Sequence, residues 1–144
     1  MSSLCVSIHS RKDICSVLFM QGGRVVLKDV SRILDEQVYT SMFESMLYCM
    51  TKALTLLRSY LAENEVTDVI FECNNSTFIK WVQQGFAKDK YQESFVQVYG
   101  LLDEIPMLYK FCCNKKPRAA LYATENYLPK LKLSGLDVSM FTDD

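Results

Sequence analysis

Residues 69–81 read VIFECNNSTFIKW and combine a strand pattern with a helix pattern around a polar turn. The first three residues are strand formers, and Asn74 and Asn75 interrupt the run. Phe78 and Val82 then recur at helical spacing. A strand that ends in a polar turn and opens a helix is where α/β proteins commonly place their chemistry. The stretch therefore predicts an α/β fold with a candidate site at this turn.

Three shorter segments precede this unit, and tight turns join them. Leu4, Val6 and Ile8 alternate with smaller or more polar residues, and the segments 14–21 and 24–33 follow as further strands. Two glycines between these segments suit the positive φ angles of a tight hairpin. Turns this short require antiparallel neighbours. The sequence therefore predicts a three-stranded antiparallel meander.

Helical periodicity follows the meander. From Thr40 to Glu63, apolar residues recur at steps of three and four, which places them on one helix face. The next elements are expected to be a strand at 69–73, helices over about 76–87 and 91–102, a strand near 107–113, and a helix over about 117–127. We expect one α/β domain over 1–128, built on a five-stranded mixed sheet, and a C-terminal tail over 129–144.

Composition restricts the classes of function. The chain has 144 residues, is 49% hydrophobic and carries a formal net charge of −1. This balance argues against a protein that coats nucleic acid over its whole surface, although it permits a local basic patch. No stretch approaches the roughly 18 consecutive apolar residues of a membrane span. The charged N-terminal segment also lacks the pattern of a secretory signal, so no membrane association is expected.

The cysteines indicate a reducing environment. They are Cys5, Cys15, Cys49, Cys73, Cys112 and Cys113. The first four lie in apolar runs, and the last two are adjacent, which suits neither an ordinary disulfide nor a CxxC redox pair. A single histidine disfavours a zinc site. The pattern predicts six reduced core thiols in a cytoplasmic protein.

The order of elements resembles the ribonuclease H-like fold, the superfamily of ribonuclease H, retroviral integrase and Holliday-junction resolvases. The resemblance covers residues 4–127. Active members use three or four carboxylates to hold two magnesium or manganese ions, which activate water and stabilise the leaving oxygen. Neutral side chains cannot balance two adjacent dications. The resemblance therefore implies nuclease activity only where the chain supplies the acids.

The first two acidic positions of the family fall in the meander and the long helix. The segment LCVSIHSRKDICSVLF resembles the resolvase pattern of an apolar strand that leads into an aspartate, a turn and a second strand. This resemblance places Ser7 where the aspartate should be, and a shifted register offers His9. In MFESML, Glu44 matches the second acid in the first turn of the helix. Of these two positions, only the second has a carboxylate in this chain, that of Glu44.

The other two acidic positions lie in the second half of the domain. The segment ECNNSTFIKW resembles ribonuclease H with Asn74 in place of the third aspartate. Resolvases carry a glutamate near the end of that strand, which Glu72 matches. In KKPRAALYA, Ala120 takes the position of the last acid. If the resemblance holds, Ser7, Glu44, Asn74 and Ala120 converge in one shallow site.

This set of residues is interpreted as a degenerate nuclease site. Serine, asparagine and alanine at three ligand positions should bind metal poorly, so no metal is expected. Glu44 and Glu72 are the candidates if one does bind. If the chain is an active nuclease, Asp13, Glu125 or the terminal acids would have to fold into the site and complete its set of ligands.

A basic segment suggests binding in place of catalysis. Between Lys110 and Lys132 there are six basic residues and one acidic residue, interleaved with aromatic residues. This composition suits phosphate contacts and base stacking, although a solvated helix end with core tyrosines has the same composition. The candidate nucleic-acid contacts are Lys110, Lys115, Lys116 and Arg118.

Three functions are open on the sequence alone. The first is a degenerate ribonuclease H-like module that binds nucleic acid or a protein partner. The second is an active metal-dependent nuclease with a rearranged site, in which magnesium or manganese would be the only cofactor. The third is a structural scaffold. A sheet edge and the apolar tail segment KLKLSGLDVSMF are candidate surfaces for a protein partner or a second copy of the chain.

Overall fold

A computed structural model describes residues 2–11, 14–32 and 42–120. Its elements are β1 (Leu4–Arg11), β2 (Ile14–Gln21), β3 (Arg24–Arg32), α2 (Met42–Glu63), β4 (Val69–Cys73), α3 (Ser76–Gln84), the 3-10 turn η1 (Asp89–Tyr91), α4 (Gln92–Asp103) and β5 (Tyr109–Cys113). This order confirms the expected sequence of strands and helices. The predicted helix start at Thr40, most of the helix over 117–127 and the tail over 129–144 lie outside the described residues.

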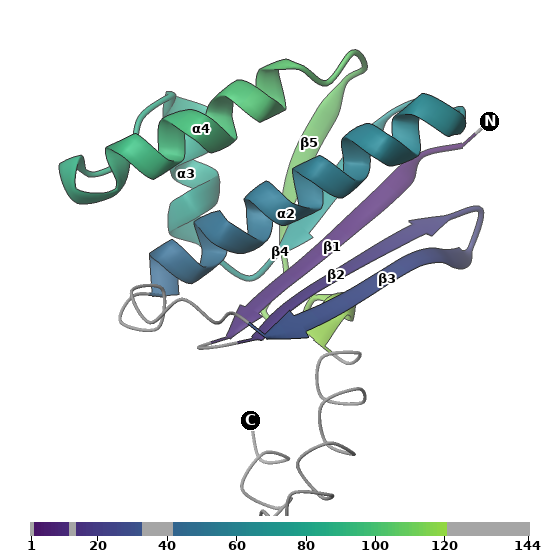
Figure 1. The fold of residues 1–144 in the computed structure, drawn as a ribbon, viewed down its shortest axis with the longest axis horizontal. Coiled ribbons are helices and arrows are strands. Elements are labelled where there is room, and N and C mark those ends of the chain that lie inside the picture. Colours follow the sequence, from purple (N-terminus) through teal and green to yellow (C-terminus); the bar gives the residue numbers. More distant parts are fainter. Residues whose placement is uncertain (1, 12–13, 33–41, 121–144) are drawn as a thin grey trace, which may run out of the picture.

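The five strands form one mixed sheet in the order β3-β2-β1-β4-β5 (Figure 1). Strand β2 pairs antiparallel with both β1 and β3, which confirms the predicted meander. Strand β4 pairs parallel with both β1 and β5. Gly22 and Gly23 adopt φ angles of 61° and 76° in the β2–β3 turn, a conformation that glycine reaches without steric cost. The α/β architecture with a five-stranded mixed sheet is therefore the observed fold.

Helices α2, α3 and α4 lie together against the sheet (Figure 1). Side chains that alternate along β1, including Val6 and Ile8, meet Met46 and Met50 of α2 in a fully buried core. Burial of each such side chain stabilises the fold by about 1.5–3 kcal/mol relative to exposure. We call this the helix side of the sheet. Residues at the intervening strand positions point to the opposite side.

Two predicted boundaries differ from the structure. Helix α3 ends at Gln84 rather than at Ala87, because Gly85 adopts a left-handed φ of 88° and its N–H donates to the Trp81 carbonyl. Strand β5 begins at Tyr109 rather than at 107. The glycine cap explains the first difference, since a left-handed residue ends the helical hydrogen-bond pattern.

The six cysteines all lie in the described part of the chain, and each is a free thiol. Cys15, Cys49 and Cys73 are buried, and Cys5 is partly buried. The prediction of a core location is wrong for Cys112 and Cys113. Both are exposed, because β5 is an edge strand. Among residues 2–11, 14–32 and 42–120, no helix has the length and apolar character needed to cross a membrane.

Candidate functional site

Ser7 and Glu72 form the centre of the candidate site. They are paired neighbours on the parallel strands β1 and β4, and both point away from the helix side. The Ser7 hydroxyl donates a hydrogen bond of 2.9 Å to Glu72 Oε1. Ser7 is inaccessible to solvent, and Glu72 is only 7% exposed. The sheet therefore holds a carboxylate in a buried position with a hydroxyl as its neighbour.

Residues 114–120, here called the closing segment, cover this pair. The Arg118 backbone N–H donates to Glu72 Oε1 over 2.8 Å, and the Asn114 side-chain amide lies 3.5 Å from Glu72 Oε2. The Ala119 N–H donates to Ser7 Oγ over 2.9 Å. The carboxylate thus accepts hydrogen bonds from a hydroxyl and a backbone amide, which offset the cost of its burial.

The same segment is tied to β2. The Ser16 hydroxyl donates to the Ala119 carbonyl over 2.6 Å, and Ala119 is fully buried. Pro117 is also buried, and its carbonyl accepts from the Ala120 N–H over 2.9 Å in the first turn of a helix. The free N–H groups of a helix start need acceptors, and the sheet supplies them here. The closing segment is therefore fixed to three strands of the sheet.

The predicted site residues separate into two layers. Ser7, Glu72 and the segment that carries Ala120 lie on one side of the sheet. Glu44 lies in the first turn of α2, in the layer of helices on the other side. Asn74 is exposed immediately after β4. The structure brings Ser7 and Glu72 together and leaves Glu44 in a different layer.

Asn75, rather than Asn74, has the local structural role in this turn. Its side chain accepts a 2.9 Å hydrogen bond from the Phe78 N–H and caps the start of α3. The two asparagines look equivalent in the sequence. The backbone conformation at the end of β4 decides which of them is the cap.

The donor set does not suit a pair of metal ions. Within the described ranges, no group of three or more His, Cys, Asp or Glu side chains is placed to hold a metal ion. Glu72 Oε1 accepts hydrogen bonds from Ser7 and Arg118. Two dications need several anionic ligands. Asp13 and Glu125, the suggested replacements, lie outside the described residues.

His9, the alternative first position, is not an anionic ligand either. Burial and the neighbouring Arg11 charge both lower the pKa of its imidazole. Its Nδ1 atom is buried and has no hydrogen-bond partner within the described ranges. The ring is therefore neutral at pH 7, which removes it as a source of charge at the site.

Four exposed basic side chains belong to β5 and the closing segment. They are Lys110, Lys115, Lys116 and Arg118. The Arg118 guanidinium extends over the sheet, where its Nη1 lies 3.9 Å from both Cys5 Sγ and Met20 Sδ. Lys110 is two positions from the strand partner of Glu72, so it lies on the same side of the sheet. We call these four residues the basic surface.

The charges of Glu72 and Arg118 both act on the Cys5 thiol. Burial raises the pKa of Cys5, the Glu72 charge raises it further, and the Arg118 charge lowers it. A carboxylate and a guanidinium therefore lie close to the same strand position.

The sequence did not predict the backbone contacts of the closing segment with Ser7 and Glu72. One signal was present, because Pro117 at a helix start indicated unpaired amides that needed acceptors.

The fold is that of solved ribonuclease H1 structures. LC11-RNase H1, isolated from compost, superimposes with a TM-score of 0.61 at 15% identity, over 87% of this chain and 92% of that chain. Its complex with an RNA/DNA hybrid gives 0.62 at 13% identity, over 84% and 93%. RNase H1 from the halophilic archaeon Halobacterium salinarum gives 0.53 at 12% identity, over 82% and 98%.

Sequence comparison finds no matching family model and no matching curated protein. The similarity to the solved ribonuclease H1 structures shows that the chain has a ribonuclease H-like fold. At these low identities it shows the fold alone.

Proposed function

We propose that this protein is a ribonuclease H-like module that binds nucleic acid through the basic surface and does not cleave it by two-metal chemistry. The observation that carries the proposal is the state of Glu72. Its carboxylate is buried, and Oε1 accepts hydrogen bonds from Ser7 and the Arg118 amide. In the described part of the chain, the Glu72 carboxylate thus has a structural use.

The donor geometry supports the absence of cleavage. A metal ion at Glu72 Oε1 would have to displace the Ser7 hydroxyl and the Arg118 N–H, and displacement of Arg118 would detach the closing segment. A buried donor left without an acceptor costs about 1–3 kcal/mol. Metal binding at Oε1 would therefore carry this cost.

Charge and position support nucleic acid as the ligand. The basic surface is exposed on a chain whose formal net charge is only −1, so its positive charge is local. Backbone phosphates bind such local clusters of lysine and arginine, and the counterions they release make binding dependent on salt. LC11-RNase H1, which shares the fold, has been solved in complex with an RNA/DNA hybrid.

Fluorescence anisotropy with labelled RNA/DNA hybrid, duplex DNA and single-stranded RNA tests the binding. Changing Lys115, Lys116 and Arg118 to alanine should weaken binding to all three ligands and reduce the salt slope by up to about three charges. A matched control changes Arg24, Lys80 and Lys88, three exposed basic residues outside the closing segment.

The control variant loses the same charge, so it should bind much like the native protein. Equal loss in both variants would show that the effect comes from overall charge. Absence of binding by the native protein at low salt would contradict the proposal and favour a protein partner or a scaffold role.

A cleavage assay tests the catalytic part of the proposal. The native protein should leave hybrid, single-stranded and branched substrates intact in magnesium and in manganese, because the described acids do not form a metal site. Metal-dependent cleavage that Glu44→Gln abolishes would establish the active-nuclease alternative instead. The six free thiols lead us to propose a reducing, cytoplasmic location.

A further inference from the structure

Two cysteines lie opposite each other at the ends of neighbouring strands. Cys73 is the last residue of β4 and Cys113 is the last residue of β5, and the parallel register pairs them directly. Residues paired in this way point to the same side of the sheet. The rings of Phe71 and Phe111, which are paired two residues earlier, stack on the helix side with centroids 4.8 Å apart. The two thiols are therefore neighbours on the helix side.

Hydrogen bonds fix the register of β5 at both ends. At its start, the Val69 N–H donates to the Leu108 carbonyl over 3.0 Å. At its end, the Asn114 N–H donates to the Cys73 carbonyl over 2.8 Å. A slip of one residue would turn Cys113 to the opposite side of the sheet and would break both bonds. The facing position of the two thiols is thus a fixed feature of the sheet.

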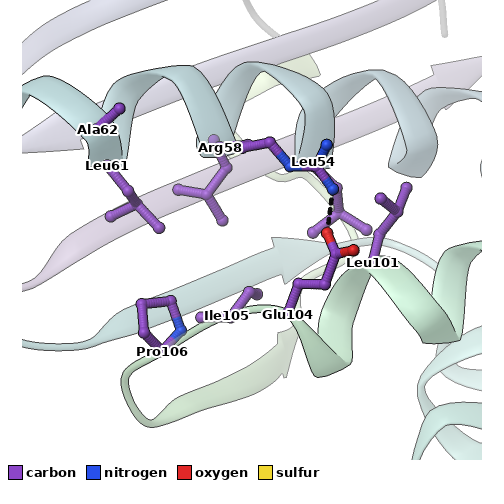
Figure 2. Close-up of a pocket in the computed structure, with 9 residues that line it drawn as sticks. Leu54, Arg58, Leu61, Ala62, Leu101, Glu104, Ile105 and Pro106 are labelled. Atoms are coloured by element: carbon purple, nitrogen blue, oxygen red, sulfur yellow. Dashed lines mark hydrogen bonds and ion pairs between the residues drawn. The ribbon is translucent and has the colours of Figure 1, made fainter.

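The loop before β5 is also attached to the helix layer. It follows α4 and borders a pocket of about 240 Å³ beside α2 (Figure 2). Leu54 and Leu61 of α2 and Ile105 of the loop line this pocket. Arg58 of α2 and Glu104, the residue that caps α4, form an ion pair next to it (Figure 2). The approach to β5 is therefore held by α2 as well as by β4.

The two facing thiols differ in their access to solvent. Cys113 is exposed on the edge strand, whereas Cys73 is fully buried. A small oxidant in solvent therefore reaches Cys113 first. Cys15 and Cys49 are also close to each other, because a hydrogen bond with the Cys15 thiol helps burial to raise the pKa of Cys49. Both of those thiols are buried, so neither offers a point of attack.

We propose that Cys73 and Cys113 are an oxidative modification site, at which hydrogen peroxide converts the two thiols into a reversible disulfide. Paired strand residues lie about 4.8 Å apart, within the range of about 4.4–6.8 Å between the Cα atoms of disulfide-bonded cysteines. Disulfides in a reducing compartment are usually transient and redox-sensing. A bond between these two residues joins the ends of β4 and β5 directly before the closing segment.

The reaction has two steps. The Cys113 thiolate attacks one oxygen of the peroxide, the O–O bond breaks, and the departing hydroxide takes up a proton and leaves as water. Cys113 then carries a sulfenic acid. The Cys73 thiolate attacks that sulfur, the S–O bond breaks, and a second water leaves as the S–S bond forms. The two thiols lose two electrons in total, and the peroxide accepts them.

The second step depends on the ionisation of Cys73. Burial raises the pKa of this thiol to about 11, a hydrogen bond from the Asn75 backbone lowers it, and the charges of Cys113, Cys112 and Glu72 raise it. The thiolate is the attacking form, so closure of the disulfide should be slow at neutral pH and quicken about tenfold per pH unit from about pH 7 to about pH 9. The sulfenic acid should therefore last long enough at neutral pH to be trapped.

Peroxide treatment of the reduced protein tests the proposal. Alkylation under denaturing conditions should then lose two of the six adducts that the untreated protein gives, and peptide mapping should find Cys73 joined to Cys113. Dithiothreitol should restore all six. Cys113→Ser should form no disulfide. Cys112→Ser is the matched control, because Cys112 is also exposed on β5 but is paired with Glu72, so this variant should still form the bond.

Trapping of the intermediate tests the order of the steps. Dimedone, which reacts with sulfenic acids, should label Cys113 in a Cys73→Ala variant treated with peroxide, and circular dichroism checks that this variant is folded. Native protein that keeps six adducts after peroxide, a Cys113→Ser variant that still loses two, or a cross-link that joins two copies of the chain would each overturn the proposal.

Discussion

The Ser7 hydroxyl lies between the Ala119 backbone amide and the Glu72 carboxylate, accepting from the first over 2.9 Å and donating to the second over 2.9 Å. The three groups come from β1, β4 and the closing segment. A serine is suited to this position because its hydroxyl both donates and accepts. An aspartate, the residue that the family resemblance implies at this position, has no proton to donate when ionised.

Removal of the Glu72 carboxylate should destabilise the fold. Glu72→Ala leaves the Ser7 hydroxyl and the Arg118 N–H buried without an acceptor, so we expect a loss of about 3 kcal/mol in the free energy of unfolding. Glu72→Gln retains an acceptor oxygen, so its free energy of unfolding should fall by less than that of Glu72→Ala. Urea denaturation followed by circular dichroism gives both values. A loss below about 1 kcal/mol for Glu72→Ala would show that these hydrogen bonds are weak.

Replacement of Ser7 by aspartate should be more damaging than replacement by alanine. Ser7→Asp places a second carboxylate at hydrogen-bond distance from Glu72, and both cannot ionise there. Sharing of a proton raises the pKa of the pair above its unfolded value, so stability is present at low pH and lost as the pH rises.

The deficit of Ser7→Asp relative to Ser7→Ala should therefore be small near about pH 4 and grow toward about pH 7. Thermal unfolding at a series of pH values measures this difference. A deficit that is independent of pH would contradict the close approach of the two side chains. The manganese dependence of the same melting temperature shows whether a second carboxylate is enough to create a metal site.

The two asparagines after β4 should respond differently to alanine. Asn75→Ala removes the cap that accepts from the Phe78 N–H and should cost about 1 kcal/mol in stability. Asn74→Ala is the matched control, because Asn74 is exposed and its side chain is not the cap of α3. Chemical denaturation of the two variants is sufficient to compare them. Equal losses would contradict the assigned cap.

The cysteines should fall into two reactivity classes. Cys112 and Cys113 are exposed and should alkylate first in the native protein. Burial raises the pKa of the Cys73 thiol to about 11, which lowers its thiolate fraction about 100-fold near neutral pH in addition to shielding it.

Mass spectrometry after native labelling should therefore find adducts at Cys112 and Cys113 and none at Cys73. Labelling under denaturing conditions without prior reduction should find six adducts, as expected for six free thiols. A reproducible deficit of two would reveal a disulfide and argue against a reducing location.

Local patterns were sufficient to predict most of the fold. Alternation along 4–8 and the Gly22–Gly23 turn predicted the meander because both act over a few neighbouring residues. The same patterns placed the end of α3 three residues too late, since Ala87 continues the apolar pattern although Gly85 has already ended the helix.

The sequence by itself determined that Ser7, Asn74 and Ala120 are neutral, so none of these three side chains can supply an anionic ligand to a metal ion. Only the tertiary structure decided the use of Glu72. Its hydroxyl partner is 65 residues away in the chain, and the amide of Arg118 is 46 residues away. Side-chain composition does not indicate which backbone N–H will meet a buried carboxylate. That contact depends on strand register and on the docking of the closing segment, which act between residues far apart in sequence.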